Sequence, residues 1–216
     1  MAWNTAETQA KLKAAAVTEF AANGLAGTRV ESIARRAGVN KERLYKYFGN
    51  KEDLFAVVIS EELARIAAAV PVLEEDGEDI GEYAGRCFDY HCDHPELVRL
   101  LHWEALELSG TAAAPDEEGR KGEYEAKTGA LRKAQRDGEL IDEVGAPYLL
   151  FIVMAMAAWW TAVPQVARMV TGVDAEADRA ARRAAVVTSA RRLAPAAPPR
   201  SRGGGGTARA ARRTRA

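Results

Sequence analysis

Apolar residues recur every three or four positions along most of the chain, which is the spacing of one face of an α-helix. In the first such segment this face holds Leu12, Ala16 and Phe20, and Asn23-Gly24 is expected to end the helix. Glycine, proline and acidic stretches separate the later segments. The pattern predicts helices at about 4–23, 28–38, 41–47, 51–70, 80–93, 96–109, 118–137, 146–163 and 175–193.

Capping residues define the short helices near the N-terminus. Thr28, with Glu31 three positions later, is expected to cap the second helix, and Gly38 is expected to end it. Asn40 is expected to cap the third helix and Asn50 the fourth. Two short helices joined through a glycine have the proportions of a helix-turn-helix.

Composition agrees with an all-α chain, because alanine is abundant and runs of β-branched residues are few. Net charge is only −1, but residues 1–55 hold nine lysines and arginines against six acids. Residues 194–216 hold six arginines and no acid. Because the whole chain has a net charge of only −1, residues 56–193 must be acidic. A cationic N-terminal segment followed by an acidic segment is typical of a protein that contacts phosphates at one end. We expect the tail to be disordered, and it either adds non-specific DNA affinity or is inert.

The most informative motif spans residues 28–54, TRVESIARRAGVNKERLYKYFGNKEDL. It resembles the DNA-binding domain of the TetR family, strongly over residues 8–60, and beyond Pro71 only in the number and order of helices. The resemblance implies a two-domain, all-helical homodimer that binds a palindromic operator in double-stranded DNA and releases it when a small molecule binds. These residues fall at the family's spacings: Ile33, Ala34, Ala37, Gly38, Val39, Leu44, Tyr45, Tyr47, Phe48, Lys51, Glu52 and Leu54.

Residues between the apolar positions of this motif are free to face DNA. Tyr45 and Tyr47 can donate their hydroxyl groups to phosphates, and Lys51 lies at a helix N-terminus, where backbone N–H groups also favour an anion. Thr28 and Asn40 can contact phosphate as well as cap their helices. The candidates for base edges in the major groove are Lys41, Glu42, Arg43 and Lys46.

No charged residue occurs between Glu143 and Arg168, so the helix at 146–163 is long and apolar enough to span a bilayer. A membrane-tethered DNA-binding regulator is therefore one alternative. The other is a helix buried on all sides, which the resemblance favours, because this helix would border the ligand cavity and the dimer interface. We expect no membrane partner and a cytoplasmic protein, and the N-terminus has no signal-peptide pattern. The last helix would complete a four-helix bundle with its symmetry mate through Ala177, Ala181, Ala184, Ala185 and Val187.

A second alternative involves cysteine and histidine. Cys87, His91 and His94 would share a helical face, which could make the regulator metal- or redox-responsive. The competing interpretation is polar lining of a cavity or ordinary surface residues. Cys87 and Cys92 are expected to be reduced thiols. No catalytic or nucleotide-binding motif is present, so we expect no enzyme, no metal and no cofactor.

The helices between residues 80 and 163 are expected to enclose the effector, a small hydrophobic or aromatic molecule. The predicted divisions are a DNA-binding domain at 1–50, a connecting helix at 51–71, a ligand-binding and dimerisation domain at 72–193 and a basic tail at 194–216. The predicted ligand-binding residues are Phe88, His91, Trp103, Glu104, Tyr124, Phe151, Met154 and Trp159.

Overall fold

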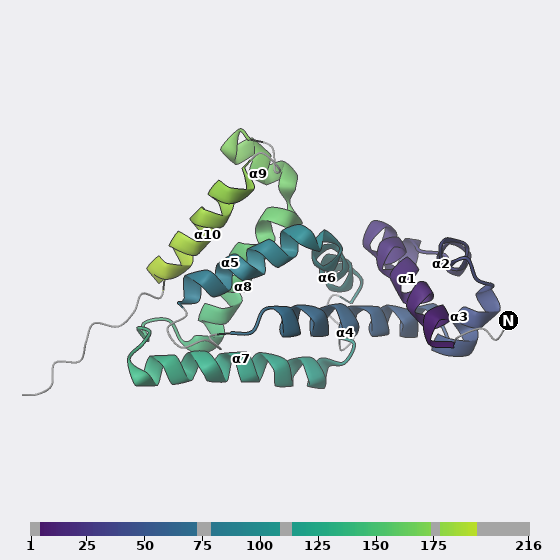
Figure 1. Ribbon diagram of the computed structural model, residues 1–216, viewed down its shortest axis with the longest axis horizontal. Coiled ribbons are helices and arrows are strands. Elements are labelled where there is room, and N and C mark those ends of the chain that lie inside the picture. The colour runs from purple at the N-terminus through teal and green to yellow at the C-terminus, as the bar shows by residue number, and fades with distance from the viewer. Residues whose placement is uncertain (1–4, 73–78, 109–113, 174–177, 194–216) are drawn as a thin grey trace, which may run out of the picture.

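The computed structural model describes residues 5–72, 79–108, 114–173 and 178–193 (Figure 1). The predicted basic tail at 194–216 lies outside the described residues, as does Ala177 of the predicted dimer contact. Within these ranges every regular element is a helix, which confirms the predicted fold class. The helices are α1 (Thr5–Gly27), α2 (Val30–Ala37), α3 (Lys41–Phe48), α4 (Lys51–Ala69), α5 (Ile80–Asp93), α6 (Pro95–Glu107), α7 (Glu117–Asp137), α8 (Ala146–Ala162), α9 (Pro164–Thr171) and α10 (Arg179–Leu193).

Helices α1–α3 form a small head at one end of the molecule (Figure 1). Phe20 of α1 meets Phe55 of α4 edge-to-face, with the two ring centroids 5.0 Å apart. Leu100 of α6 is also fully buried in this cluster. The core of the head therefore includes side chains from α4 and α6, so the head is not packed as an independent unit.

The backbone leaves the helical conformation at Gly24, where φ is 70° and ψ is −179°, although helical turns resume up to Gly27. This is the predicted end of the first helix. A Cβ atom at Gly24 would lie 2.7 Å from the Trp103 ring and 2.6 Å from the Glu107 carboxylate. The position needs glycine for its backbone angles and for the close approach of α6.

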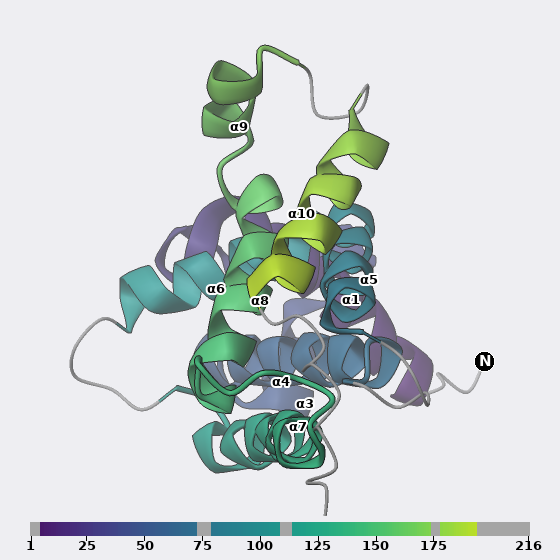
Figure 2. The ribbon, with the colours of Figure 1, turned by 90° about the vertical axis from the view of Figure 1, so that its left-hand side faces the viewer.

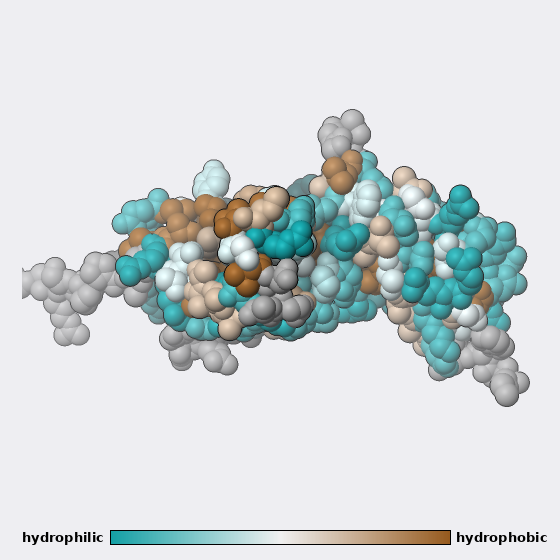
Figure 3. Space-filling view, turned by 90° about the horizontal axis from the view of Figure 1, so that it is seen from above, coloured by the Kyte–Doolittle hydropathy of each residue, from teal (hydrophilic) through white to brown (hydrophobic). Residues whose placement is uncertain are grey.

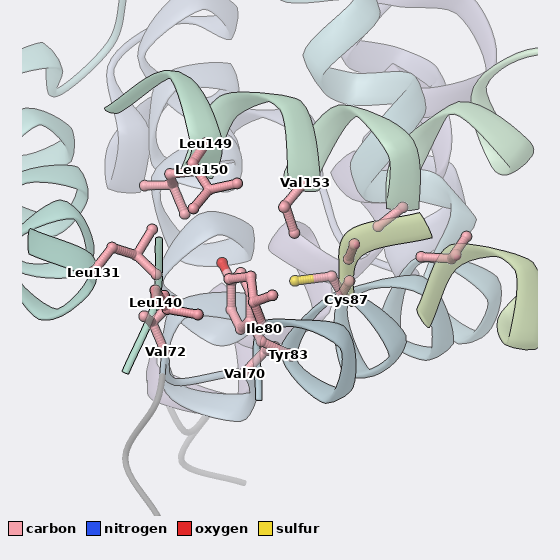
Figure 4. Close-up of a cluster of buried hydrophobic side chains, with 14 of the residues drawn as sticks. Val70, Val72, Ile80, Tyr83, Cys87, Leu131, Leu140, Leu149, Leu150 and Val153 are labelled. Carbon is pink, nitrogen blue, oxygen red and sulfur yellow. The ribbon is translucent and has the colours of Figure 1, made fainter. Parts of the chain in front are cut away.

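Helix α4 runs from the head into the larger body, which α5–α10 complete (Figure 1). The core of the body lies between α5, α7 and α8. Figure 4 shows Leu149, Leu150 and Val153 of α8 directed toward Ile80 and Tyr83 of α5, and all five side chains are buried.

Ion pairs hold α10 along α5, and α10 lies beside α8 at the end of the molecule (Figure 2). Arg183 contacts Asp89 at 2.6 Å, and Arg191 contacts Asp79 at 2.9 Å. The other side of α10 is exposed at Ala181, Ala184 and Ala185. These small residues are therefore available for the predicted dimer contact. Val187, however, is buried, so its predicted role in the dimer contact is wrong.

Helix α9 was not expected from the sequence, which predicted one helix up to residue 163. The chain bends by 88° between α8 and α9, and Pro164 begins the new helix. Proline restricts the preceding residue to extended backbone and has no N–H to donate, so it favours a new helix start rather than continuation. The eight residues of α9 are too few for a clear periodicity.

Candidate DNA interface and ligand cavity

Helix α3 is fixed in the head by a glycine turn and by apolar side chains. Gly38 has φ 67° and its N–H donates back to the last turn of α2, which ends that helix. Ile33 and Leu44 are fully buried. The Asn40 side chain accepts from the backbone N–H of Glu42, which confirms the predicted cap. Helix α3 thus presents one fixed side to solvent.

That solvent side carries most of the residues predicted to read bases. Lys41, Glu42, Tyr45 and Lys46 are exposed, whereas Arg43 and Tyr47 are half-buried at its edges. These positions follow the i, i+1, i+4, i+5 spacing of one helical face. The ammonium group of Lys41 lies 3.2 Å from Glu31 of α2, and this hydrogen-bonded carboxylate raises the pKa of Lys41.

Thr28 and Lys51 are placed differently from the prediction. The N-cap of α2 is Arg29, and the Thr28 hydroxyl instead donates to the carbonyl oxygen of Gly24 at 2.6 Å, so its predicted capping role is wrong. Thr28 is 3% exposed. The Lys51 Nζ donates to the carbonyl oxygens of Leu25 at 2.6 Å and Thr28 at 3.1 Å. Both side chains join the end of α1 to its neighbours and point into the head.

A cavity of 690 Å³ lies in the body. Its size is in the range of small-molecule sites. Helices α4 to α8 all contribute to it, and several lining side chains, including Glu123 and Phe151, are exposed, so it opens to solvent. The apolar lining includes Leu63, Ile66, Ala67, Leu97, Val98, Leu101, Phe151, Met154 and Ala158.

Half of the predicted ligand-binding residues line this cavity, namely His91, Tyr124, Phe151 and Met154. The other four lie outside it. Phe88 is fully buried on the side of α5 that faces α10, where the Arg182 guanidinium lies 5.9 Å from its ring centroid. The indole N–H of Trp103 donates to Ala21 of α1, and Trp159 is 58% exposed on the outside of α8.

Glu104 also lies outside the cavity but reaches one of its lining residues. Its two carboxylate oxygens accept from Arg120 at 2.7 and 2.9 Å, a bidentate pair between α6 and α7. Both side chains are largely buried, and the hydrogen-bonded carboxylate raises the pKa of Arg120. Glu104 therefore neutralises a cation at the cavity edge.

The sequence prediction missed Tyr83, Cys87 and Lys127, which line the cavity with His91. Tyr83, Cys87 and His91 are four residues apart on α5, a spacing that would have identified a common face. In Figure 4 the Cys87 side chain extends toward Tyr83, on the side of α5 below Val153 of α8. Lys127 stands among small residues of α7, which gives little signal in the sequence.

Burial shifts the pKa values of these groups in the direction of their neutral forms. It lowers the pKa of His91 to about 4 and raises that of Cys87 to about 11, and it raises the pKa of Tyr83, whose side chain is hydrogen-bonded to Cys87. Burial also lowers the pKa of Lys127. The Nδ1 atom of His91 is buried without a hydrogen-bond partner among the described residues.

The described part of the chain brings no three histidine, cysteine, aspartate or glutamate side chains together as a metal site. Cys87 and Cys92 are free thiols. His94 follows the end of α5, where it lies 3.6 Å from Glu96 and against the Tyr90 ring. The alternative of a metal- or redox-responsive cluster at Cys87, His91 and His94 is therefore not supported.

Helices α4 and α6 each contact both the head and the cavity. Helix α4 contributes Leu63, Ile66 and Ala67 to the cavity, while its first half belongs to the head core. On α6, Arg99 Nε donates to the carbonyl oxygen of Ala21 at 2.7 Å. A change in the cavity that moves either helix would move a helix that is packed on the head.

Within one chain helix α8 is buried on one side only, and its other side is available for the predicted dimer interface. Tyr148 and Phe151 are each 74% exposed, and Ile152 and Trp159 are exposed on the same helix. Seen from above, the head is largely hydrophilic, whereas apolar side chains gather at the opposite end, around α8 and α9 (Figure 3). No single helix among the described residues meets the length and hydropathy of a membrane span, and the bent pair α8–α9 meets them only together.

Comparison with known proteins agrees with this architecture. The family profile "Bacterial regulatory proteins, tetR family" matches residues 12–58, and "Tetracyclin repressor-like, C-terminal domain" matches residues 79–192. The chain is 45% identical over 184 residues to the HTH-type transcriptional repressor SCO4008 of Streptomyces coelicolor, an alignment covering 82% of this chain and 94% of that protein. It is 29% identical over 163 residues to the HTH-type transcriptional regulator RutR of Escherichia coli K12, covering 73% and 76%.

A solved structure has the same fold. The transcriptional regulator SCO4942 of Streptomyces coelicolor superposes with a TM-score of 0.72 at 34% identity, covering 88% of this chain and 99% of that one. Both profiles, the two relatives and this structure thus agree on one family of transcriptional regulators. The chain belongs to the TetR family of bacterial regulatory proteins.

Proposed function

We propose that this protein is a homodimeric repressor that binds a palindromic operator in double-stranded DNA and is released by a small molecule bound in the 690 Å³ cavity. The observation that carries the proposal is that α4 and α6 line this cavity and also pack on the head that presents α3. The relative SCO4008 is named as a transcriptional repressor, which supports repression rather than activation of transcription. A protein that binds an operator in this way would act in the cytoplasm.

The DNA contact is proposed to centre on the exposed side of α3. Lys41, Glu42, Arg43 and Lys46 would reach base edges, and Tyr45 and Tyr47 would donate to phosphates. Asn40 would contact phosphate near the start of the helix. Thr28 and Lys51 would reach a phosphate only by giving up hydrogen bonds to backbone carbonyl groups, so we assign them to holding the head together first.

Two heads are needed for a palindrome, and the exposed sides of α8 and α10 are the proposed dimer surface. A contiguous apolar surface is costly to leave in water, and small residues on α10 permit close helix packing. Sedimentation should give a dimer for the native protein and monomers for Trp159→Glu. Leu106→Glu, which changes another exposed apolar residue, is the control and should stay dimeric. A folded native monomer at micromolar concentration would contradict the dimer.

The coupling is proposed to run through α4 and α6. The two recognition helices of a dimer must lie about one DNA turn apart, roughly 34–36 Å, to enter successive major grooves. A ligand wedged between α4 and α6 would shift both helices and move the heads out of register. It can do so only as far as it binds the DNA-incompetent form more tightly.

Selection from random double-stranded DNA with the purified protein tests the proposed function. The proposal predicts enrichment of a palindrome with two equal half-sites. Enrichment should be lost with a Tyr45→Ala, Lys46→Ala double variant and retained with Lys121→Ala, which removes an exposed lysine from α7. Failure of the native protein to enrich any palindrome would overturn the proposal.

A further inference from the structure

We propose that the cavity selects an amphipathic organic acid: an apolar body with one carboxylate or acidic hydroxyl group, which the Lys127 ammonium binds. This inference rests on the proposed function in that it names the chemical class of its effector. It depends on the charges that the cavity wall presents and on which of them are already neutralised within the protein.

Most of the wall is suited to a hydrocarbon or aromatic body. Leu63 and Ile66 of α4 face the same space as Leu97 and Leu101 of α6, and α8 adds Met154. These side chains offer no hydrogen bond to a polar ligand. Burial of an apolar surface among them would supply most of the binding free energy, without selecting one head group over another.

Lys127 supplies that selection. It projects from α7 into the cavity and is half-buried, and no carboxylate among the described residues lies within ion-pair distance of it. The other lysines of α7 are paired on the solvent side, Lys121 with Glu117 at 2.9 Å and Lys133 with Asp137 at 2.9 Å. Burial without a close anion lowers the pKa of Lys127, so a bound anion would restore its preference for the charged form.

The other basic groups of the wall do not compete for the same anion. Arg120 is neutralised by its bidentate pair with Glu104. Burial keeps His91 uncharged at neutral pH by lowering its pKa to about 4. His102 is exposed at the edge, where its ring nitrogen contacts the Val98 carbonyl oxygen at 2.7 Å.

Two carboxylates also border the cavity and could attract a cationic ligand. Asp116 and Glu123 are both exposed, so water solvates them and screens their charge. Glu123 lies one turn before Lys127 and interacts with it electrostatically without forming an ion pair. A cationic ligand at the mouth of the cavity would interact with these two acids. An anionic ligand deeper in the cavity would interact with Lys127, which lies near Cys87 of α5. The desolvated charge has the larger effect on selectivity, because electrostatic interactions strengthen as water is excluded.

Matched probes test the assignment. One series is dodecanoate, dodecanol and dodecyltrimethylammonium, with the two ions below their micelle concentrations and the alcohol below its solubility limit. The other series is naphthylacetate, naphthylethanol and naphthylmethyltrimethylammonium. Tryptophan fluorescence titration of the full-length protein should give each acid at least about tenfold tighter binding than its alcohol, with the cation weakest. Equal or tighter binding of the alcohol or the cation, or no binding of either acid at millimolar concentration, overturns the proposal.

Variants locate the effect. Lys127→Met should remove the preference for the acid and leave the affinity for the alcohol within about twofold, and Lys127→Arg should keep the preference. Lys121→Met, on the solvent side of the same helix, should behave as the native protein. Circular dichroism and unchanged binding of the alcohol establish that Lys127→Met is folded; if it does not fold, Lys127→Gln takes its place. A variant without the cation that still prefers the acid overturns the proposal.

Operator binding separates this inference from the function on which it rests. Lys127→Met should bind the operator as tightly as the native protein, because α7 contributes no side chain to the core of the head. If the acids bind as expected but the native protein enriches no palindrome, the proposed function fails and the head-group selection stands. If the operator is bound and no acid preference is found, only the inference fails.

Discussion

The head and the body are built from the same kinds of helices but differ in how their interiors are filled. In the head, Leu12, Phe20 and Leu54 are fully buried around one closed core. In the body, a comparable core between α5, α7 and α8 stops beside a cavity of 690 Å³. The close-packed core of the head holds α3 in one position. The core of the body leaves a cavity, and a ligand that occupies it can change the arrangement of the helices around it.

Removing a leucine side chain from each region should destabilise the head more than the body. Leu12→Ala should lower the free energy of unfolding by about 3 kcal/mol, because it opens a hole in a close-packed core. Leu101→Ala, in the cavity wall, should cost about 1 kcal/mol or less, because its side chain is half-buried and already borders empty space. Urea unfolding followed by tryptophan fluorescence measures both. Equal losses would mean that the two interiors are packed alike.

A second difference is that the body buries a histidine, while the head contains none. The folded protein keeps His91 neutral down to a pKa of about 4, whereas the unfolded chain protonates it below about 6.5. Stability should therefore fall as the pH drops from 6.5 toward 4, by about 3 kcal/mol relative to His91→Gln, and be independent of this group above pH 6.5. A constant difference between the two proteins across this pH range would contradict the burial of a neutral imidazole.

The boundary between the regions can be broken at Gly24. Gly24→Ala should cost about 3 kcal/mol, because the backbone angles there strain any side chain and a Cβ atom would meet Trp103 of α6. Gly38→Ala is the control within the head: it also has a positive φ, but no atom lies within 4 Å of the added carbon, so about 1 kcal/mol is expected. Thermal unfolding compares them, and equal costs would remove the argument for tight contact between α1 and α6.

The smallest expected effects concern DNA. Lys46→Ala should change the preferred base at one position in each half-site and cost about 1–2 kcal/mol of binding. Tyr45→Phe should weaken all sequences about equally, by about 1 kcal/mol, because it removes one hydrogen bond to phosphate. Binding to a panel of single-base operator variants separates the two patterns. A uniform loss for both variants would show that α3 reads no base through Lys46.

The sequence predicted the head well because local signals determine its structure. Asn40 and Asn50 cap the helices that they were expected to cap, and Gly38 ends α2. Buried positions such as Ile33 and Leu44 follow from the helical period. What local pattern could not predict were hydrogen bonds between distant segments, such as that from the Lys51 ammonium to the carbonyl oxygen of Leu25.

The cavity was harder to predict, because the same aromatic side chain can line a cavity, fill a core or remain exposed. Phe88 and His91 lie three positions apart on α5, yet one faces α10 and the other faces the cavity. Trp159 was expected to line the cavity and is exposed on α8. Such outcomes depend on which helix packs against each face, and the period of a single helix does not contain that information.

The proposed regulation requires that the cavity and the DNA-binding head be coupled. The most direct measurement is the affinity of a molecule that binds in the cavity, taken from the probe series or from a screen against the purified protein, with and without saturating operator DNA. Linkage requires that operator DNA lower the protein's affinity for that molecule by the same factor by which the molecule lowers the affinity for operator DNA. We predict at least about tenfold weaker binding in the presence of operator, equivalent to about 1.4 kcal/mol of coupling. Equal affinity in the two titrations would contradict it.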